Sequence, residues 1–246
     1  MKKYLHLAIS LFIVVCFVSP AEGNWLQRGL DALNGGQNET AQETGLPQSE
    51  IILGLKEALR MGSENVISHL GRKNGYYENP RAHIPLPRSL KKIQPVLEKA
   101  GLGQMLTDLE LRMNRAAEKA TPKAKDLFFD AISQMTLTDA RNILQGPDDA
   151  ATRYFQDKMS QPLEKEFSPI VQESLSESGA VRTYDNMMGD YKNIPFVPDV
   201  NADLTNHVVD YSLMAIFDYL AEEEAEIRNN PAQRTTDILR KVFGNR

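Results

Sequence analysis

Along most of this chain, apolar residues recur at spacings of three and four, which places them on one face of an α-helix. The first such stripe follows Pro47, ends at Gly71, and contains Ile52, Leu55, Leu59, Val66 and Leu70. A second stripe runs over residues 102–120 and ends in alanines, whose small side chains indicate that a neighbouring helix approaches closely. Alternating apolar runs do not exceed three or four residues, so the pattern predicts an all-α fold.

Further helices are predicted between the prolines and glycines that divide the rest of the chain. They are expected over residues 89–99 with a kink at Pro95, 122–132, 138–144, 148–159, shorter pieces bracketed by Pro162 and Pro169 up to residue 177, 203–229 and 231–244. Residues 179–192 are ambiguous. Together these segments predict one compact domain of about eight to ten helices over residues 47–246.

Two extended connections rich in proline interrupt the helices, at residues 74–87 and 193–198. Prolines at the spacing found in both segments cannot lie inside a helix. The first connection also contains tyrosines and Ile84, so we expect it to pack against the helical body.

The first 21 residues have the layout of a secretory signal peptide. A basic head precedes a nearly continuous apolar run, and small residues then allow cleavage after Ala21 or, as the alternative, after Gly23. The run is shorter than the roughly 20 apolar residues of a membrane helix, so no integral membrane span is expected after cleavage. Cys16 follows bulky branched residues, and a lipoprotein is therefore not expected. Residues 22–46 predict an N-terminal segment and a flexible linker.

Charge and cysteine content narrow the class of protein further. The 28 basic and 33 acidic residues give a net charge of −5, which loss of Lys2 and Lys3 with the signal peptide would change to −7. No stretch is rich in basic residues, so neither nucleic acid nor an anionic lipid surface is an expected partner. Cys16 is the only cysteine, so the processed chain would have no disulfide or thiolate site. The sequence predicts a soluble periplasmic protein.

The helix predicted over residues 203–229 contains the most informative polar residue. Glu224 lies on its apolar face between Leu220 and Ile227, where a carboxylate is unfavourable unless it is paired. Arg228 follows one turn later and can reach it. The preferred interpretation is a structural ion pair. The alternatives are a carboxylate that lines a cleft and has a shifted pKa, and a helix end that is simply exposed.

The opposite side of the same helix carries Asp203, His207 and Asp210, at spacings that would allow them to chelate a metal ion. Solvated helix faces show the same spacing, and Asp218 continues the polar stripe. The sequence identifies no ligand from a second element. Neither a metal site nor a cofactor is therefore predicted.

Candidate site residues also occur in two other helices. In the helix over residues 102–120, Asn114 is expected to be partly buried, while Arg115 and Glu118 should form an exposed ion pair. Arg115 would become a candidate partner for Glu224 if a second helix covered that side. In the helix over residues 148–159, Thr152 precedes an aromatic pair, Tyr154 and Phe155, which are most simply core residues.

Five motifs occur in order, at residues 54–59, 84–87, 113–118, 150–155 and 223–244. Together they resemble a family of exported Gram-negative proteins described as domain of unknown function 4197, over residues 47–244. The resemblance marks residues 114–118 and 224–228 as family motifs. It implies a periplasmic location and no established activity.

The sequence has no nucleophile elbow, no phosphate-binding loop and no His-Glu-x-x-His motif. We therefore expect an exported, non-catalytic helical protein that binds a small amphipathic ligand or an envelope protein. The candidate ligand-binding residues are Asn114, Arg115, Glu118, Thr152, Tyr154, Glu223, Glu224 and Arg228.

Two other functions fit the same sequence. An envelope hydrolase would use an acid–base pair drawn from Glu223, Glu224 and Asp139, with Arg115 or Arg228 as the contact for an anionic group. In an assembly role, Trp25 and the linker up to residue 44 would tether a partner.

Overall fold

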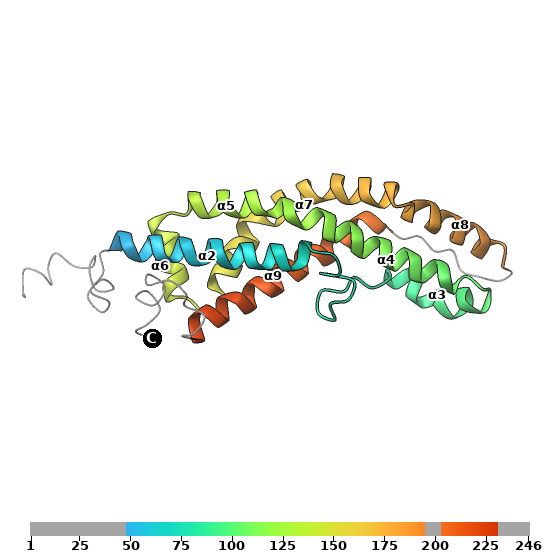
Figure 1. Ribbon diagram of the computed structural model, residues 1–246, viewed down its shortest axis with the longest axis horizontal. Coiled ribbons are helices and arrows are strands. Elements are labelled where there is room, and N and C mark those ends of the chain that lie inside the picture. The colour runs from blue at the N-terminus through green and yellow to red at the C-terminus, as the bar shows by residue number, and fades with distance from the viewer. Residues whose placement is uncertain (1–47, 195–202, 231–246) are drawn as a thin grey trace, which may run out of the picture. The chain divides into compact units, whose positions relative to one another are not determined.

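The computed structural model describes residues 48–194 and 203–230 (Figure 1). The chain divides into two units, Met1–Glu43 and Thr44–Arg246, and every described residue belongs to the second. The predicted signal peptide, Cys16, the N-terminal linker, residues 195–198 of the second connection and the last predicted helix all lie outside the described residues.

The fold is all-α, as the apolar pattern predicted, and the described residues contain no strand. They form eight α-helices and one short 3-10 helix: α2 (Gln48–Gly71), α3 (Arg88–Lys99), α4 (Gly103–Ala120), η1 (Thr121–Lys123), α5 (Ala124–Gln134), α6 (Leu137–Gln145), α7 (Ala150–Glu177), α8 (Ala180–Lys192) and α9 (Leu204–Asn229). None of the helices in this part of the chain is long and apolar enough to cross a membrane.

Helix α7 differs from the prediction, because Pro162 and Pro169 lie inside one continuous helix and do not divide it. A proline removes one backbone N–H and usually breaks a helix. Both prolines are on the exposed side of α7, where water can bind the carbonyls left without a donor. The opposite side is held by a fully buried stripe that includes Leu163, Phe167 and Val171. The ambiguous segment after Gly179 forms helix α8.

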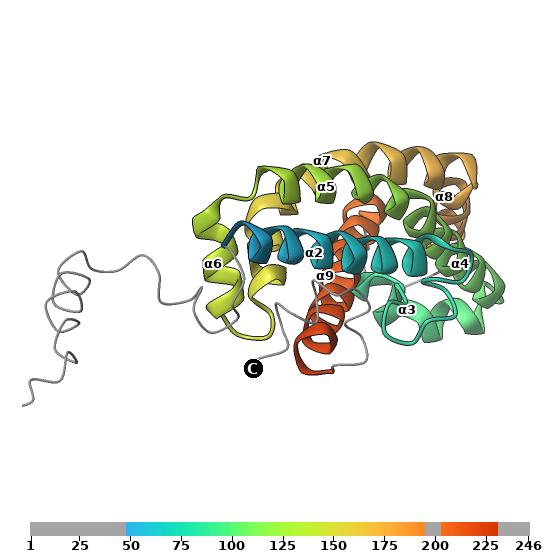
Figure 2. The ribbon, with the colours of Figure 1, turned by 60° about the vertical axis from the view of Figure 1, so that its left-hand side comes forward.

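Helices α7 and α9 form the centre of this unit. Helix α7 packs against α4, α5 and α9, while α2 packs against both α5 and α9. Figures 1 and 2 both show α2 lying between α5 on one side and α9 on the other. The main core is continuous through these helices, and a second, smaller core joins α2, α6 and the start of α7 through Leu55, Ala58, Met135, Ala140, Ile143 and Ala151.

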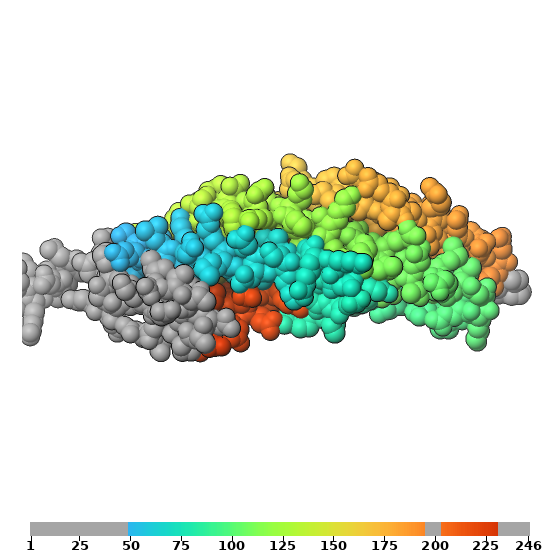
Figure 3. Space-filling model, in the orientation of Figure 1, coloured from blue at the N-terminus to red at the C-terminus, as the bar shows by residue number. Residues whose placement is uncertain are grey.

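The connection between α2 and α3 packs against the helical body, as predicted from its tyrosines and Ile84. Tyr76, Ala82, Ile84 and Leu86 are buried. In the space-filling view this segment forms a filled part of the surface beside the end of α2 and next to α9 (Figure 3). An extended segment with its backbone against a core requires hydrogen-bond partners for its buried amides.

Candidate functional site

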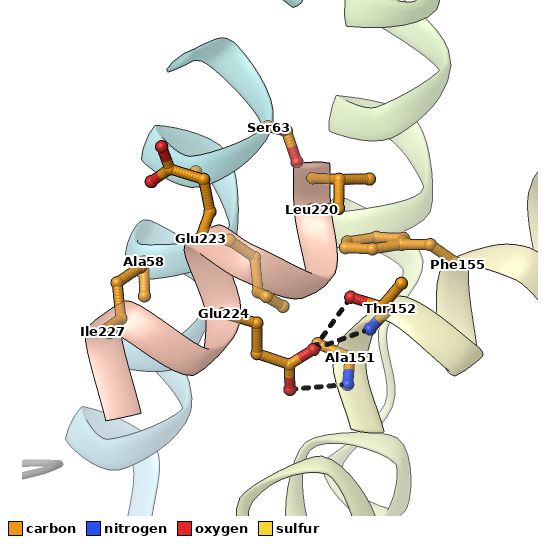
Figure 4. Close-up of a pocket in the computed structure, with 11 residues that line it drawn as sticks. Ala58, Ser63, Ala151, Thr152, Phe155, Leu220, Glu223, Glu224 and Ile227 are labelled. Atoms are coloured by element: carbon orange, nitrogen blue, oxygen red, sulfur yellow. Dashed lines mark hydrogen bonds between the residues drawn. The ribbon is translucent and has the colours of Figure 1, made fainter. Parts of the chain in front are cut away.

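The candidate residues Glu224, Arg228 and Thr152 form one buried network between α9, α7 and α6. One carboxylate oxygen of Glu224 accepts a hydrogen bond from the backbone N–H of Ala151 at 2.8 Å. The other accepts from the backbone N–H of Thr152 at 2.9 Å and from its hydroxyl at 3.0 Å (Figure 4). Glu224 is 8% exposed, so periodicity correctly placed it on the buried face of α9.

Glu224 acts as the N-terminal cap of α7, although it belongs to another helix. The amides of Ala151 and Thr152 lie in the first turn of α7, where backbone N–H groups have no acceptor within the helix. Asp149, the residue in the cap position, makes no side-chain cap hydrogen bond. A carboxylate at this end is also favoured by the helix dipole.

Arg228 completes the network and joins it to α6. Its Nε and Nη2 donate to Glu224 at 3.0 and 2.7 Å, and Nη2 also donates to the carbonyl of Ile143 at 2.8 Å. Since Ile143 lies in the last turn of α6, the arginine satisfies a carbonyl at the end of that helix. The geometry is that of a structural ion pair.

The cavity beside this network is too small for an organic ligand. It lies between α2, α7 and α9 and has a volume of about 20 Å³, room for about one water molecule. Its lining includes Ser63, Thr152, Phe155 and Glu224 (Figure 4).

A second buried network fastens the α2–α3 connection to α4. Asn114 is completely buried, more than the partial burial predicted, and it pairs with the backbone of Ile84 in both directions. Its Oδ1 accepts from Ile84 N at 2.9 Å, and its Nδ2 donates to Ile84 O at 2.8 Å. Nδ2 also donates to the carbonyl of Glu110.

The expectation that Arg115 and Glu118 form an exposed pair was wrong for Glu118, which is 5% exposed. The two side chains are paired at 2.5 Å, but the α2–α3 connection covers this side of α4. Glu118 accepts from the backbone N–H groups of Tyr76 and Tyr77, both at 3.3 Å. The suggested contact between Arg115 and Glu224 is replaced by a hydrogen bond from Arg115 to Asn74 at 2.5 Å.

The backbone conformation of Asn74 is one reason why this connection needs a polar anchor. Its φ of 66° is the only positive value among the described residues other than glycine. This left-handed conformation is uncommon, and asparagine is one of the residues that adopt it most readily. The hydrogen bond from Arg115 holds the side chain of Asn74 in place while the backbone turns away from α2.

Tyr154 was expected to belong to the core, and it is half-buried and packs against both cores. It also lines an open depression between α5, α6 and α7. The depression has a volume of about 370 Å³, and we call it the Tyr154 depression. Its lining consists of Leu127, Asp130, Ala131, Gln134, Thr136, Asp139, Tyr154, Lys158, Met159 and Pro162. Burial and the nearby Asp139 carboxylate raise the pKa of Tyr154, so its hydroxyl is neutral.

Apolar and charged side chains both line the Tyr154 depression. Leu127, Met159 and the Tyr154 ring supply apolar surface, while carboxylates and Lys158 supply charge. Pro162 cannot donate the hydrogen bond that the carbonyl of Lys158 would receive in a regular helix. Lys158 was not among the candidates, although it lies inside the helix predicted over residues 148–159.

Asp139 lines the Tyr154 depression and also caps its own helix. It accepts from the hydroxyl and the backbone N–H of Thr136, and Thr136 in turn accepts from the Asp139 amide. The hydrogen bonds from Thr136 lower the pKa of Asp139 below the usual value for an aspartate.

We expect Asp139→Ala to lower the free energy of unfolding by about 1 kcal/mol at neutral pH. A carboxyl group whose pKa is lowered in the folded protein stabilises it above the unfolded value, and this contribution disappears as the pH falls through the folded value. The difference between wild type and variant should therefore shrink at about pH 3. Urea denaturation at neutral pH and at about pH 3 measures this difference. A difference that is the same at both pH values would contradict the role of Asp139 as a helix cap.

Glu223 lies apart from Asp139, in a hollow of about 470 Å³ between α2 and α9. Burial raises its pKa, and the carboxylates of Glu222 and Glu226 raise it further, against a hydrogen bond from Asn65. His69 lines the same hollow and its pKa is lowered, mainly by burial.

The three carboxylates considered for a hydrolase do not share a cleft of substrate size. Asp139 lines the Tyr154 depression, whereas Glu223 and Glu224 share only the cavity of about 20 Å³. Both oxygens of Glu224 are already bound to α7. The geometry therefore gives no support to an acid–base pair drawn from these residues.

The polar face of α9 makes contacts of its own. Asp203 accepts from the amide of Asn206 at the start of the helix, and His207 is hydrogen bonded to the carbonyl of Pro85. Within residues 48–194 and 203–230, no group of three histidine, cysteine or acidic side chains could hold a metal ion.

The sequence model of one family, described as "Protein of unknown function (DUF4197)", matches residues 45–244. No curated protein and no solved structure matches the chain.

Proposed function

We propose that this chain, which belongs to the DUF4197 family of proteins of unknown function, is a non-catalytic protein. In this proposal it binds a small amphipathic ligand. The binding site is the Tyr154 depression. The observation that supports this proposal is an open hollow of about 370 Å³ that combines apolar and charged side chains. Sites for small molecules usually have volumes of about 300–1,000 Å³ and a few polar groups in an apolar lining.

The arrangement of the lining suggests how such a ligand would bind. Its apolar part would cover Leu127, Met159 and the ring of Tyr154, which all line the depression. Its polar group would face Lys158, which offers an ammonium group and a carbonyl without its usual helical donor. Asp139 is engaged by Thr136 and would contribute mainly through its charge.

We further propose that the ligand is met in the periplasm. The support is the signal-peptide pattern of residues 1–21, with its basic head, apolar run and small residues before the cleavage position.

Mass spectrometry of the protein secreted into a Gram-negative periplasm tests the ligand proposal. Under native conditions the wild type should show an added mass that disappears on denaturation. Tyr154→Ala and Lys158→Glu should reduce the occupied fraction by about tenfold, because each removes roughly 1.4 kcal/mol or more of contact. Tyr211→Ala on α9, which also removes a half-buried tyrosine, is the matched control and should keep the added mass. A bare wild type, or equal occupancy in all variants, would overturn the proposal.

A further inference from the structure

Three hollows lie in a row along the contact between α2 and α9, which we call the α2–α9 seam. Two have volumes of about 20 Å³ and lie beside Leu59 and Ile227, and the third is the 470 Å³ hollow beside Val66 and Tyr219. Gly62 contributes to this hollowed surface, since a Cβ built there would be 3.9 Å from the Cβ of Glu223. The two small hollows, which α7 also bounds at Ala151, are lined largely by apolar side chains, whereas the large hollow is lined mainly by polar ones.

One edge of the seam carries an excess of negative charge. Glu222, Glu223 and Glu226 follow one another on α9. Glu222 is paired with Arg81, whereas among the described residues neither Glu223 nor Glu226 has an ion-pair partner. The mutual repulsion of these carboxylates contributes to the raised pKa of Glu223. A cationic group beside them would relieve this repulsion.

Residues 231–244 have the opposite character and follow α9 directly. They contain Arg234, Arg240 and Lys241 but only one acidic residue, Asp237. In the helix that their sequence predicts, Ile238, Leu239, Val242 and Phe243 form an apolar stripe. Arg234 and Lys241, seven residues apart, flank this stripe on one side, and Arg240 projects from the other.

The length and starting point of this segment fit the seam. It begins after Asn230, one turn beyond Glu226. A helix of about 13 residues is about 20 Å long, and the part of α9 from Tyr219 to Asn230 spans about 16 Å. A helix that turned back along α9 would therefore pass all three hollows. The family match includes this segment, because it extends to residue 244.

We propose that residues 231–244 bind along the α2–α9 seam as an intramolecular ligand. The apolar stripe covers Leu59 and Ile227, and the flank that carries Arg234 and Lys241 faces the acidic edge. This surface is distinct from the Tyr154 depression, so either proposal can fail without the other.

Hydrogen exchange of the full chain, followed by mass spectrometry, tests this docking. Amides of residues 235–243 should be protected in the wild type. Arg234→Glu with Lys241→Glu reverses the charges of the segment and should reduce the protection by about tenfold. Glu223→Lys with Glu226→Lys reverses the charges of the acidic edge and should have the same effect. Combining the two pairs should restore it, because the charges are then exchanged and not lost.

Two single changes serve as controls. Arg240→Glu alters the other flank of the segment, and Glu164→Lys alters an exposed position on α7. Both should leave the protection unchanged. Rapid exchange in the wild type, or protection that neither reversal affects, would overturn the proposal. Protection that increases with protein concentration would also overturn it and would indicate a second copy of the chain as the occupant.

Discussion

Glu224→Ala is expected to lower the free energy of unfolding by about 3–5 kcal/mol, the range found when one partner of a buried ion pair is removed. The change leaves Arg228, which is 3% exposed, without its carboxylate. It also leaves the amides of Ala151 and Thr152 without acceptors in a buried position. Each loss is unfavourable, because a buried donor left without its acceptor costs the desolvation of that group. Urea denaturation followed by far-UV circular dichroism measures the effect.

Two further variants distinguish the loss of this network from the general effect of removing a glutamate. Glu164→Ala, at an exposed position of α7, should change stability by less than about 0.5 kcal/mol. Glu224→Ala combined with Arg228→Met should recover part of the loss, because no unpaired charge remains buried. A loss below about 1 kcal/mol for Glu224→Ala would show that the network is not a stabilising ion pair.

The helices that the sequence predicted best are those whose apolar stripes face a single core. The boundaries of α2, α4 and α9 follow their stripes closely, because periodicity and end signals agree there. Helix α7 was predicted as separate pieces, since two prolines outweighed the stripe in a local interpretation. Burial of Leu163, Phe167 and Val171 against other helices stabilises α7 as one helix. The sequence of α7 alone does not show this packing, because it depends on the neighbouring helices.

The contacts of the polar candidates with distant segments could not be predicted from the sequence either. Glu224 could be placed on a buried face and paired with Arg228, because both lie on one helix. Its contacts with Ala151 and Thr152, 73 and 72 residues away in sequence, depend on how α7 meets α9. Glu118 was expected in solvent because the stripe of α4 points elsewhere, and only the α2–α3 connection buries it. Tyr154 packs against the core, as expected of an aromatic residue beside Phe155, but the depression that it also lines depends on how α5 and α6 meet α7.

The motifs that carry the family resemblance largely describe two joints of the fold. Residues 84–87 and 113–118 meet in the network of Asn114 and Glu118, which holds an extended connection against α4. Residues 150–155 and 223–228 meet where Glu224 caps α7. Most candidates from these motifs therefore have a structural role. Tyr154 and Glu223 are exceptions, because each lines a hollow of a few hundred Å³, and the proposed function depends on the hollow of Tyr154.

Asn114→Ala should lower the free energy of unfolding by about 2–4 kcal/mol, since it leaves both backbone groups of Ile84 buried without partners. Ile84 is completely buried, so water cannot take the place of the amide. The α2–α3 connection has no strand or helix ladder to hold it, and side chains of α4 supply several of its anchors, while His207 and Tyr219 of α9 supply others.

The change should also act locally, which distinguishes it from a general loss of core packing. Amides of residues 76–87 should exchange faster in Asn114→Ala well below the unfolding transition, while those of α7 should keep their protection. Thr107→Ala, an exposed change on the same helix, is the matched control and should leave both regions as in the wild type. Equal acceleration in α7 and in the connection would mean that Asn114 supports the whole core. Acceleration confined to residues 76–87 would establish that the polar motif on α4 exists to hold this connection in place.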